Sequence, residues 1–264
     1  MTCCPPGFLA RGRRGLRGLA GVLVVLAIGE VAGRSGLVDR SYLPPSSDVL
    51  WRLALLLGDG GFLRDLAATV AAVGSGLLVA LVVAAPAGLL LGGLPWVNSA
   101  VRVVVEFLRP IPGVALIPLA ILLIADQAAM ERTLAAYAAT WPILLNTIYA
   151  VGEVDPMARE TARCFGFGRP AIAWFVTLPS VAPFVATGVR VSAGIALIVV
   201  VSTELIAGGG EHGVGIFILT ASGDTAHADV VYAAVAAVGL LGYLIDVLLR
   251  SAERRLFRWH FARA

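Results

Sequence analysis

Long apolar runs dominate this chain, and short polar segments separate them. Six runs are long enough to cross about 30 Å of hydrocarbon, since a helix rises about 1.5 Å per residue. We predict membrane helices over about residues 16–32, 65–94, 101–124, 133–151, 181–206 and 229–249. The predicted fold class is all-α: a polytopic membrane protein with about six transmembrane helices. We treat 1-264 as one transmembrane domain, with an N-terminal membrane helix at about 16-32 and a core at about 65-250.

The third run contains Pro110, Pro112 and Pro118. Proline removes a backbone donor and clashes with the preceding turn, so this span must be bent or partly unwound. Irregular backbone at membrane depth persists only against protein or a water-filled cavity. The span is therefore a candidate wall of a solute pathway, and a kinked structural helix beside a subunit interface is the alternative.

Polar residues inside these runs are candidate pathway residues. They are Glu106, Arg109, Pro112, Asn146 and Glu204. Charges in hydrocarbon are costly, so each must be paired, reach the interface or face a cavity. For Asn146 we expect a bond to a neighbouring helix, with a solute contact as the alternative. For Arg190 we expect structural pairing or access to the interface, whereas Glu204 fits a structural and a pathway role equally well.

Composition agrees with a membrane location and gives an orientation. The chain is 59% hydrophobic and 14% charged, with a mean hydropathy of +0.90, whereas soluble domains are about 25% charged. Every basic residue is an arginine, and the arginines gather at both termini and around residues 159–169. Positive residues mark the cytosolic side, so we expect both termini and this segment in the cytosol. Nucleic-acid binding is not indicated, because the arginines fall at the edges of apolar spans.

The remaining polar segments are expected on the outer side. Residues 33–62 should form a loop with a short helix capped by Ser46 or Ser47. Asp126, Glu131 and Arg132 should form a short loop, and residues 208–216 a glycine-rich loop or re-entrant segment. We expect His212 and His227 to be solvated.

The two ends of the chain carry further features. Arg11, Arg13, Arg14 and Arg17 precede the first run; a cleaved signal peptide has the same basic start, but this run is longer than the usual signal. The three cysteines are Cys3, Cys4 and Cys164. Adjacent cysteines rarely pair, and we expect three free thiols and no metal site.

One polar stretch, about 152-179, interrupts the membrane pattern. Asp155 and Pro156 are typical of a helix start, and Gly166 of a helix end in left-handed conformation. Residues on one face of this helix form a ridge of small and apolar side chains: Met157, Ala158, Thr161, Ala162 and Phe165. A second short helix should follow over Ala171 to Thr177 and stop at Leu178 and Pro179. An exposed apolar ridge on a cytosolic helix–turn–helix implies a protein partner.

The spacing of Glu160, Ala162, Gly166, Leu178 and Pro179 resembles the EAA signature of permease subunits of bacterial ABC importers. Here Thr161 replaces the usual second alanine and Val176 an isoleucine. The segments 107–112, 116–119, 204–215 and 253–259 are similar to the nitrate, sulfonate and taurine branch of that family. The resemblance implies a type I importer permease fold in the bacterial cytoplasmic membrane, with the stretch 152-179 forming coupling helices.

The resemblance also implies partners: two cytosolic ATPase subunits, a second permease subunit that we take to be another copy of this chain, and an extracytoplasmic binding protein. We expect residues 213–216 to contact the binding protein. The chain lacks a P-loop, so we expect no enzyme activity and no cofactor of its own, with ATP and Mg²⁺ in the ATPase subunits. The resemblance implies as solute a small molecule such as nitrate, a sulfonate or taurine, or another small organic molecule.

Three other classes of protein share part of this pattern. A secondary transporter also has kinked helices and buried charge but does not need a cytosolic helix–turn–helix. A membrane-embedded enzyme would show clustered carboxylates or histidines at one membrane face. A membrane scaffold that transports nothing fits the hydropathy but leaves the EAA spacing unexplained.

Overall fold

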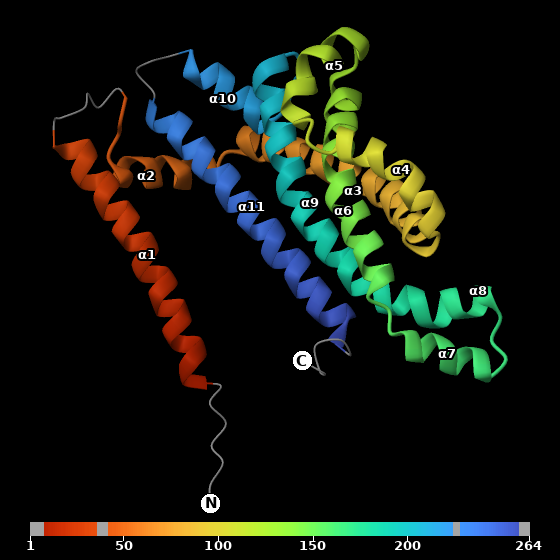
Figure 1. Cartoon of the computed structure of the whole chain (residues 1–264). Coiled ribbons are helices and arrows are strands. Elements are labelled where there is room, and N and C mark those ends of the chain that lie inside the picture. Colours follow the sequence, from red (N-terminus) through yellow and green to blue (C-terminus); the bar gives the residue numbers. More distant parts are fainter. Residues whose placement is uncertain (1–7, 36–41, 224–227, 259–264) are drawn as a thin grey trace, which may run out of the picture. The chain divides into compact units, whose positions relative to one another are not determined.

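The computed structural model describes residues 8–35, 42–223 and 228–258, with the side chains of residues 8–16 and 19 left out. Within these ranges every regular element is a helix, which confirms the all-α prediction. The helices are α1 (Phe8–Arg34), α2 (Ser46–Leu56), α3 (Gly60–Gly93), α4 (Pro95–Leu108), η1 (Gly113–Leu116), α5 (Ile117–Leu123), α6 (Gln127–Gly152), α7 (Pro156–Cys164), α8 (Arg169–Ile172), η2 (Ala173–Thr177), α9 (Leu178–Ala207), α10 (Val214–Ser222) and α11 (Ala228–Leu256) (Figure 1).

Four of the described helical stretches are long and apolar enough to cross a membrane. They are Gly60–Gly93, Gln127–Gly152, Arg169–Ala207 and Ala228–Leu256. A fifth span results if α4 and the η1–α5 segment, which meet at 76°, count as one broken span. The remaining predicted span, about 16–32, is the first along the chain. It falls in α1, whose side chains are only partly described. The predicted free thiols of Cys3 and Cys4, and the predicted solvated His227, lie outside the described residues.

The chain divides into two compact units, which are residues Met1–Gly60 with Thr220–Ala237, and residues Gly61–Leu219 with Val238–Ala264. In the first unit, α1 holds the start of α2. The Glu30 carboxylate accepts hydrogen bonds from the Ser47 amide at 2.9 Å and the Ser47 hydroxyl at 3.1 Å. The prediction of a serine cap was therefore wrong: Ser46 and Ser47 lie inside α2, and a carboxylate from α1 takes the free amide of the first turn.

The core of the second unit lies between α3, α6 and α9. Its buried residues are mostly small or branched: Val73, Ala80, Ala84, Ala135, Ala139, Ile143, Leu144, Ala196, Leu197 and Val200. Helices in lipid associate through close van der Waals packing, and small residues permit it. A Cβ on Gly76 would lie 2.5 Å from the Ala135 Cβ, and one on Gly188 would lie 3.1 Å from the Ile143 Cα. Glycine at these positions lets α6 approach α3 and α9 backbone to backbone.

The proline-rich span is bent, as predicted. α4 starts at Pro95, and the chain turns through Arg109–Pro112 into η1 and α5. The bend exposes carbonyls, and Tyr137 of α6 donates to one of them, the Leu108 carbonyl, at 3.0 Å. Irregular backbone is thus satisfied by a neighbouring helix, as membrane-depth backbone requires.

α6 begins earlier than predicted, at Gln127. The Asp126 carboxylate accepts from the Ala129 amide at 2.7 Å and caps the helix. Glu131 and Arg132 therefore lie in the first turns of α6, and the predicted loop over these residues was wrong. The reason is that an aspartate followed by good helix formers is a helix start, which outweighs the local density of charge.

Candidate functional site

The helix of the polar stretch forms between the predicted start and stop. The Asp155 carboxylate accepts from the Met157 amide at 2.9 Å, and Pro156 occupies the first turn. At the other end Gly166 adopts a φ of +84°, and the Phe167 amide donates to the Ala162 carbonyl at 3.1 Å. This pattern is the Schellman ending, which glycine favours because it has no Cβ. The sequence thus sets the length of α7 without help from the membrane helices.

Arg159 attaches α7 to the end of α6. Its guanidinium donates to the Val151 carbonyl at 2.7 Å, one of the last carbonyls of α6, which have no partner within the helix. The bond fixes α7 against α6, so a force on α7 reaches a core helix directly. The sequence did not single out Arg159, because an arginine beside a helix end has no motif of its own.

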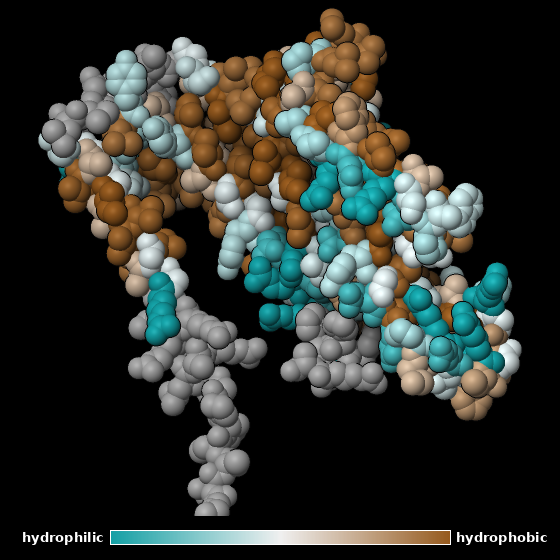
Figure 2. All heavy atoms as spheres, in the orientation of Figure 1, coloured by the Kyte–Doolittle hydropathy of each residue, from teal (hydrophilic) through white to brown (hydrophobic). Residues whose placement is uncertain are grey.

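Apolar side chains are exposed on the α7–α8 segment, by which we mean residues 155–177, from the cap of α7 to the end of η2. Met157 is 67% and Phe165 is 78% exposed, and Phe167, Trp174 and Phe175 are exposed as well. In Figure 2 hydrophilic side chains gather over α7 and α8 with apolar ones among them, whereas apolar surface covers α5. Large apolar side chains on a capped, polar helix mark a surface for a protein partner.

The short helix predicted over Ala171 to Thr177 does not stop at Leu178 and Pro179, so that prediction was wrong. The chain forms α8, continues through the π-helical turn η2 and enters α9, so that residues Arg169–Ala207 make one helical stretch (Figure 1). A π-helical turn is wider than an α-helical one. It accommodates the Pro179 ring and the absence of an amide hydrogen on this residue, so the helix need not break. The polar stretch is therefore continuous with a membrane span.

A cleft of about 600 Å³ lies beside the proline bend. It brings together Arg109, Pro112 and Asn146, three of the five candidate pathway residues, with Trp141 and Ile195. Of the described residues that line it, only Arg109 is charged. Trp141 contributes a buried indole N–H, and among the described buried side-chain atoms this is the one without a hydrogen-bond partner. The cleft therefore offers a solute the guanidinium of Arg109 and, among its described lining residues, no carboxylate.

The other candidate pathway residues lie elsewhere. Glu106 pairs with Arg102 at 2.6 Å on the exposed side of α4. Glu204 is 1% exposed and bonds to Thr69 and the start of α10. Asn146 donates to the Pro142 carbonyl at 2.8 Å within α6, so the expected bond to a neighbouring helix was wrong. The cleft residues are gathered by the bend, which no spacing in the sequence reveals.

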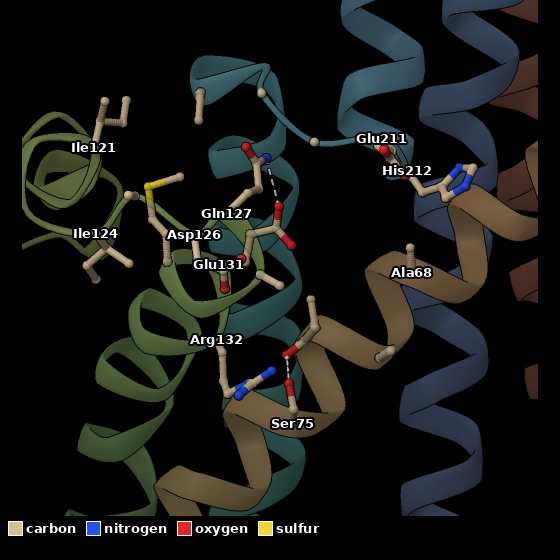
Figure 3. Close-up of a pocket in the computed structure, with 18 residues that line it drawn as sticks. Ala68, Ser75, Ile121, Ile124, Asp126, Gln127, Glu131, Arg132, Glu211 and His212 are labelled. Carbon is tan, nitrogen blue, oxygen red and sulfur yellow. Dashed lines mark hydrogen bonds between the residues drawn. The ribbon is translucent and has the colours of Figure 1, made fainter.

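A second, polar cavity of about 890 Å³ lies between α3, the start of α6 and the loop before α10. Figure 3 shows Glu131 facing Gln127, which donates to it at 2.9 Å, with Glu211 and His212 on the loop. The His212 ring lies 3.1 Å from the Asp65 carboxylate and is half exposed. Three acidic residues and one arginine line this cavity: Asp126, Glu131, Glu211 and Arg132. The cavity therefore suits a basic group.

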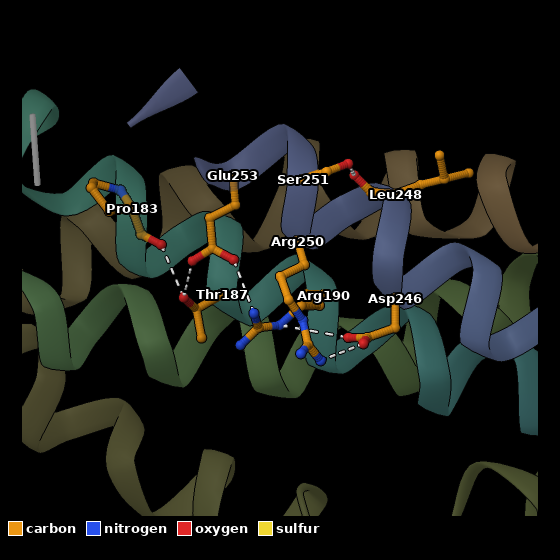
Figure 4. A network of polar contacts seen from close by, with 8 residues as sticks. All are labelled: Pro183, Thr187, Arg190, Asp246, Leu248, Arg250, Ser251 and Glu253. Carbon is orange, nitrogen blue, oxygen red and sulfur yellow. Dashed lines mark hydrogen bonds and ion pairs between the residues drawn. The ribbon is translucent and has the colours of Figure 1, made fainter. Parts of the chain in front are cut away.

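Arg190 is held by carboxylates of α11 (Figure 4). Its guanidinium donates to Glu253 at 3.1 Å and lies 3.9 Å from Asp246, and Thr187 donates to Glu253 at 2.9 Å. Glu253 is buried. A buried charge needs a partner, and this arrangement supplies one, so the expected structural pairing of Arg190 is confirmed.

A long match to a known family accompanies this geometry. Residues 76–258 match the family described as "Binding-protein-dependent transport system inner membrane component", which is well over half of the chain. The chain belongs to this family. The matched part contains α3 from Gly76 onwards, α6, α9, the bend and the whole α7–α8 segment. The type I permease fold of the family agrees with the helical architecture of the structure.

Relatives place this permease in one branch of ABC importers. It is 28% identical over 242 residues to the taurine transport system permease protein TauC of Escherichia coli (strain K12), covering 90% of this chain and 87% of that protein. It is 28% identical over 236 residues to the putative aliphatic sulfonates transport permease protein SsuC of Bacillus subtilis (strain 168), covering 89% and 84%. It is 27% identical over 198 residues to the nitrate import permease protein NrtB of Leptolyngbya laminosa, covering 75% and 70%. The permease is therefore a multi-pass protein of the inner membrane.

Proposed function

We propose that this permease forms the membrane pathway of an ATP-driven importer for a small solute such as nitrate, a sulfonate, taurine or another small organic molecule. Two cytosolic ATPase subunits, a second copy of this chain and an extracytoplasmic binding protein complete the importer. ATP and Mg²⁺ bind in the ATPase subunits, and this chain carries out no catalysis. Both termini and the α7–α8 segment face the cytosol, because the arginines gather there.

The observation that carries the proposal is the exposed α7. The helix is capped at both ends, bonded to α6 through Arg159, and carries the exposed apolar side chains of Met157 and, at its C-terminal end, Phe165. Such a surface fits a cleft on an ATPase subunit. The contact residues are Asp155, Met157, Ala158, Glu160, Thr161, Ala162, Phe165 and Gly166, with Leu178 and Pro179 supporting the turn into α9.

The mechanism is alternating access. ATP binding closes the two ATPase subunits, which displace α7 and α8. Because α7 is bonded to α6, and α8 is continuous with α9, two core helices move with the ATPases. The solute pathway then opens to the outside and receives a solute from the binding protein.

The cleft at the proline bend is the part of the pathway that meets the solute. Arg109 and Asn146 present polar groups to it, and Pro112 keeps the backbone open. An anionic group of the solute would be met by the Arg109 guanidinium. The binding protein docks at the opposite end from α7. Gly213, Val214 and Gly215 are buried, so the expected contact through residues 213–216 is replaced by one through Glu211, His212 and the polar cavity.

Gly166 gives a test of the coupling assignment. Gly166 has a φ of +84° whereas Gly168 has a φ of −73°, so Gly166→Val strains the end of α7 and Gly168→Ala does not. In proteoliposomes with the ATPase subunits, Gly166→Val should abolish the stimulation of ATP hydrolysis by the loaded binding protein, with normal membrane insertion. Gly168→Ala should behave as wild type. Normal transport by Gly166→Val would contradict the assignment, and transport without any ATPase subunit would favour a secondary transporter.

A further inference from the structure

The start of α10 is held by side chains that come from two other helices. The Gly213 amide donates to the Asp65 carboxylate at 3.3 Å, and the Val214 amide donates to the Thr69 hydroxyl at 3.0 Å. The Gly215 amide donates to the Glu204 carboxylate at 2.7 Å. Helices usually cap their first amides with a residue just before the helix. Here α3 and α9 supply the cap for three successive amides.

Glu204 joins these contacts into one network. Its second carboxylate oxygen accepts from the Thr69 hydroxyl at 2.8 Å, so both of its oxygens are engaged. Glu204 and Thr69 are each at most 1% exposed. Loss of either partner would leave a buried polar group without a hydrogen bond, which proteins avoid strongly.

The glycines of this segment make the close approach feasible. A Cβ on Gly213 would lie 2.7 Å from the Glu204 carboxyl carbon, and a Cβ on Gly215 would lie 2.6 Å from the Glu204 Cβ. Phe217 of α10 also packs edge to face on the buried ring of Phe62, with the ring centroids 5.0 Å apart. Polar and apolar contacts together hold α10 against α3 and α9. A movement of the loop over residues 208–213 must therefore either follow α3 and α9 or break the hydrogen bonds at the start of α10.

The helix that carries Glu204 extends to the other end of this unit. Residues Arg169–Ala207 form one helical stretch of 39 residues, roughly 58 Å at 1.5 Å per residue. It begins at α8 and ends one turn beyond Glu204, where Gly208 turns the chain with a φ of +60°. The stretch bends at η2, between α8 and α9 (Figure 1). Its backbone is continuous through the bend, and a continuous helix is a physical route for coupling between its two ends.

We propose that Glu204 and Thr69 are positioning residues that couple the nucleotide state at the α7–α8 segment to the loop over residues 208–213. The proposal rests on the proposed function, because it needs an ATPase at the α7–α8 segment. In this arrangement Glu204 moves with α9 and carries the start of α10 with it. The loop over residues 208–213 thereby takes one position for each nucleotide state of the ATPase subunits.

The experiment is hydrogen exchange on the full importer in lipid nanodiscs, with and without Mg-ATP and orthovanadate. Nucleotide should change the exchange of peptides over residues 156–166 and over residues 208–218 in the wild type. In Glu204→Gln the first response should remain and the second should be lost, because glutamine can accept from only one of the two donors. The Gly215 amide should also exchange on the order of tenfold faster, as expected for the loss of its hydrogen bond to the Glu204 side chain.

Matched variants separate coupling from folding. Glu253→Gln alters another buried carboxylate, which accepts from Thr187 and Arg190 and has no bond to α10 in the described structure; both nucleotide responses should persist. If Glu204→Gln does not assemble, Thr69→Val removes the bridging hydroxyl with little change in shape and should lose the second response, whereas Thr69→Ser should keep it.

The outcomes distinguish the two proposals. A response over residues 208–218 that persists in Glu204→Gln or Thr69→Val overturns the coupling role. A wild type that responds over residues 156–166 alone also overturns it. A wild type without a response over residues 156–166 would instead contradict the proposed function.

Discussion

Tyr137 donates a hydrogen bond of 3.0 Å to the carbonyl of Leu108, which lies four residues before Pro112. In a regular helix this carbonyl would accept from the amide of residue 112, which proline lacks. The Ile111 amide contacts the same carbonyl at a longer 3.2 Å. The tyrosine therefore replaces the missing donor and supports the bend from the neighbouring helix.

Tyr137→Phe should loosen the bend. The Leu108 carbonyl loses its best donor, and we expect a destabilisation of about 1–3 kcal/mol. Thermal unfolding in detergent or nanodiscs measures it, and solute transport should fall because the cleft adjoins the bend. Tyr149→Phe is the control, since that ring is 61% exposed and its replacement should change little. Equal stabilities of the two variants would contradict the role of Tyr137.

Gly76→Ala should disrupt the packing of α3 on α6. A Cβ at Gly76 would lie 2.5 Å from the Ala135 Cβ and 3.0 Å from the Arg132 carbonyl, so the helices must separate. We expect a loss of about 1–3 kcal/mol, typical of overpacking. Gly74 is two residues away, and a Cβ there meets nothing within 4 Å. Gly74→Ala should be neutral or stabilise the helix by up to about 1 kcal/mol. Unfolding of both variants in the same lipid checks the contrast.

The contacts between Arg190 and Glu253 should show strong coupling in a double-mutant cycle. Arg190→Met leaves the buried Glu253 carboxylate without its cation, and we expect a loss of about 3 kcal/mol. Arg190→Met with Glu253→Leu should cost clearly less than the sum of the single changes. The exposed pair of Arg102 and Glu106 provides the comparison, because exposed ion pairs contribute little. Additive effects at Arg190 and Glu253 would show that the pairing is not structural.

Arg109→Gln should impair transport rather than stability. Arg109 is the charged residue of the cleft lining, and a charge-assisted bond to an anionic solute is stronger than a neutral one. With nitrate, taurine and an alkanesulfonate as probes, uptake by the reconstituted importer should fall on the order of tenfold, through a higher KM. Arg102→Gln on the exposed side of α4 should transport as wild type. Unchanged uptake by Arg109→Gln would exclude the cleft from the anion pathway.

The sequence by itself determined the elements whose signals are local. Apolar runs set the membrane helices, three prolines set the bend, and Asp155, Pro156 and Gly166 set both ends of α7. Each of these signals acts through the backbone of a few neighbouring residues. The EAA spacing could be recognised in the sequence for the same reason. The segment lies between two membrane spans, and residues beside it in the sequence fix both ends of its first helix.

Only the tertiary structure decided which polar groups meet. In the structure Glu30 of α1 accepts from the first turn of α2. Glu204 lies outside the cleft at Arg109 and instead accepts from the Gly215 amide at the start of α10. The helix of α8 also continues through η2 and Pro179 into α9, because a π-helical turn accommodates a residue without an amide hydrogen. These outcomes depend on how close the helices approach, and that distance is set by glycine and alanine contacts between segments far apart in the chain. A periodic pattern reports which face of a helix is apolar, but it does not report which helix covers that face.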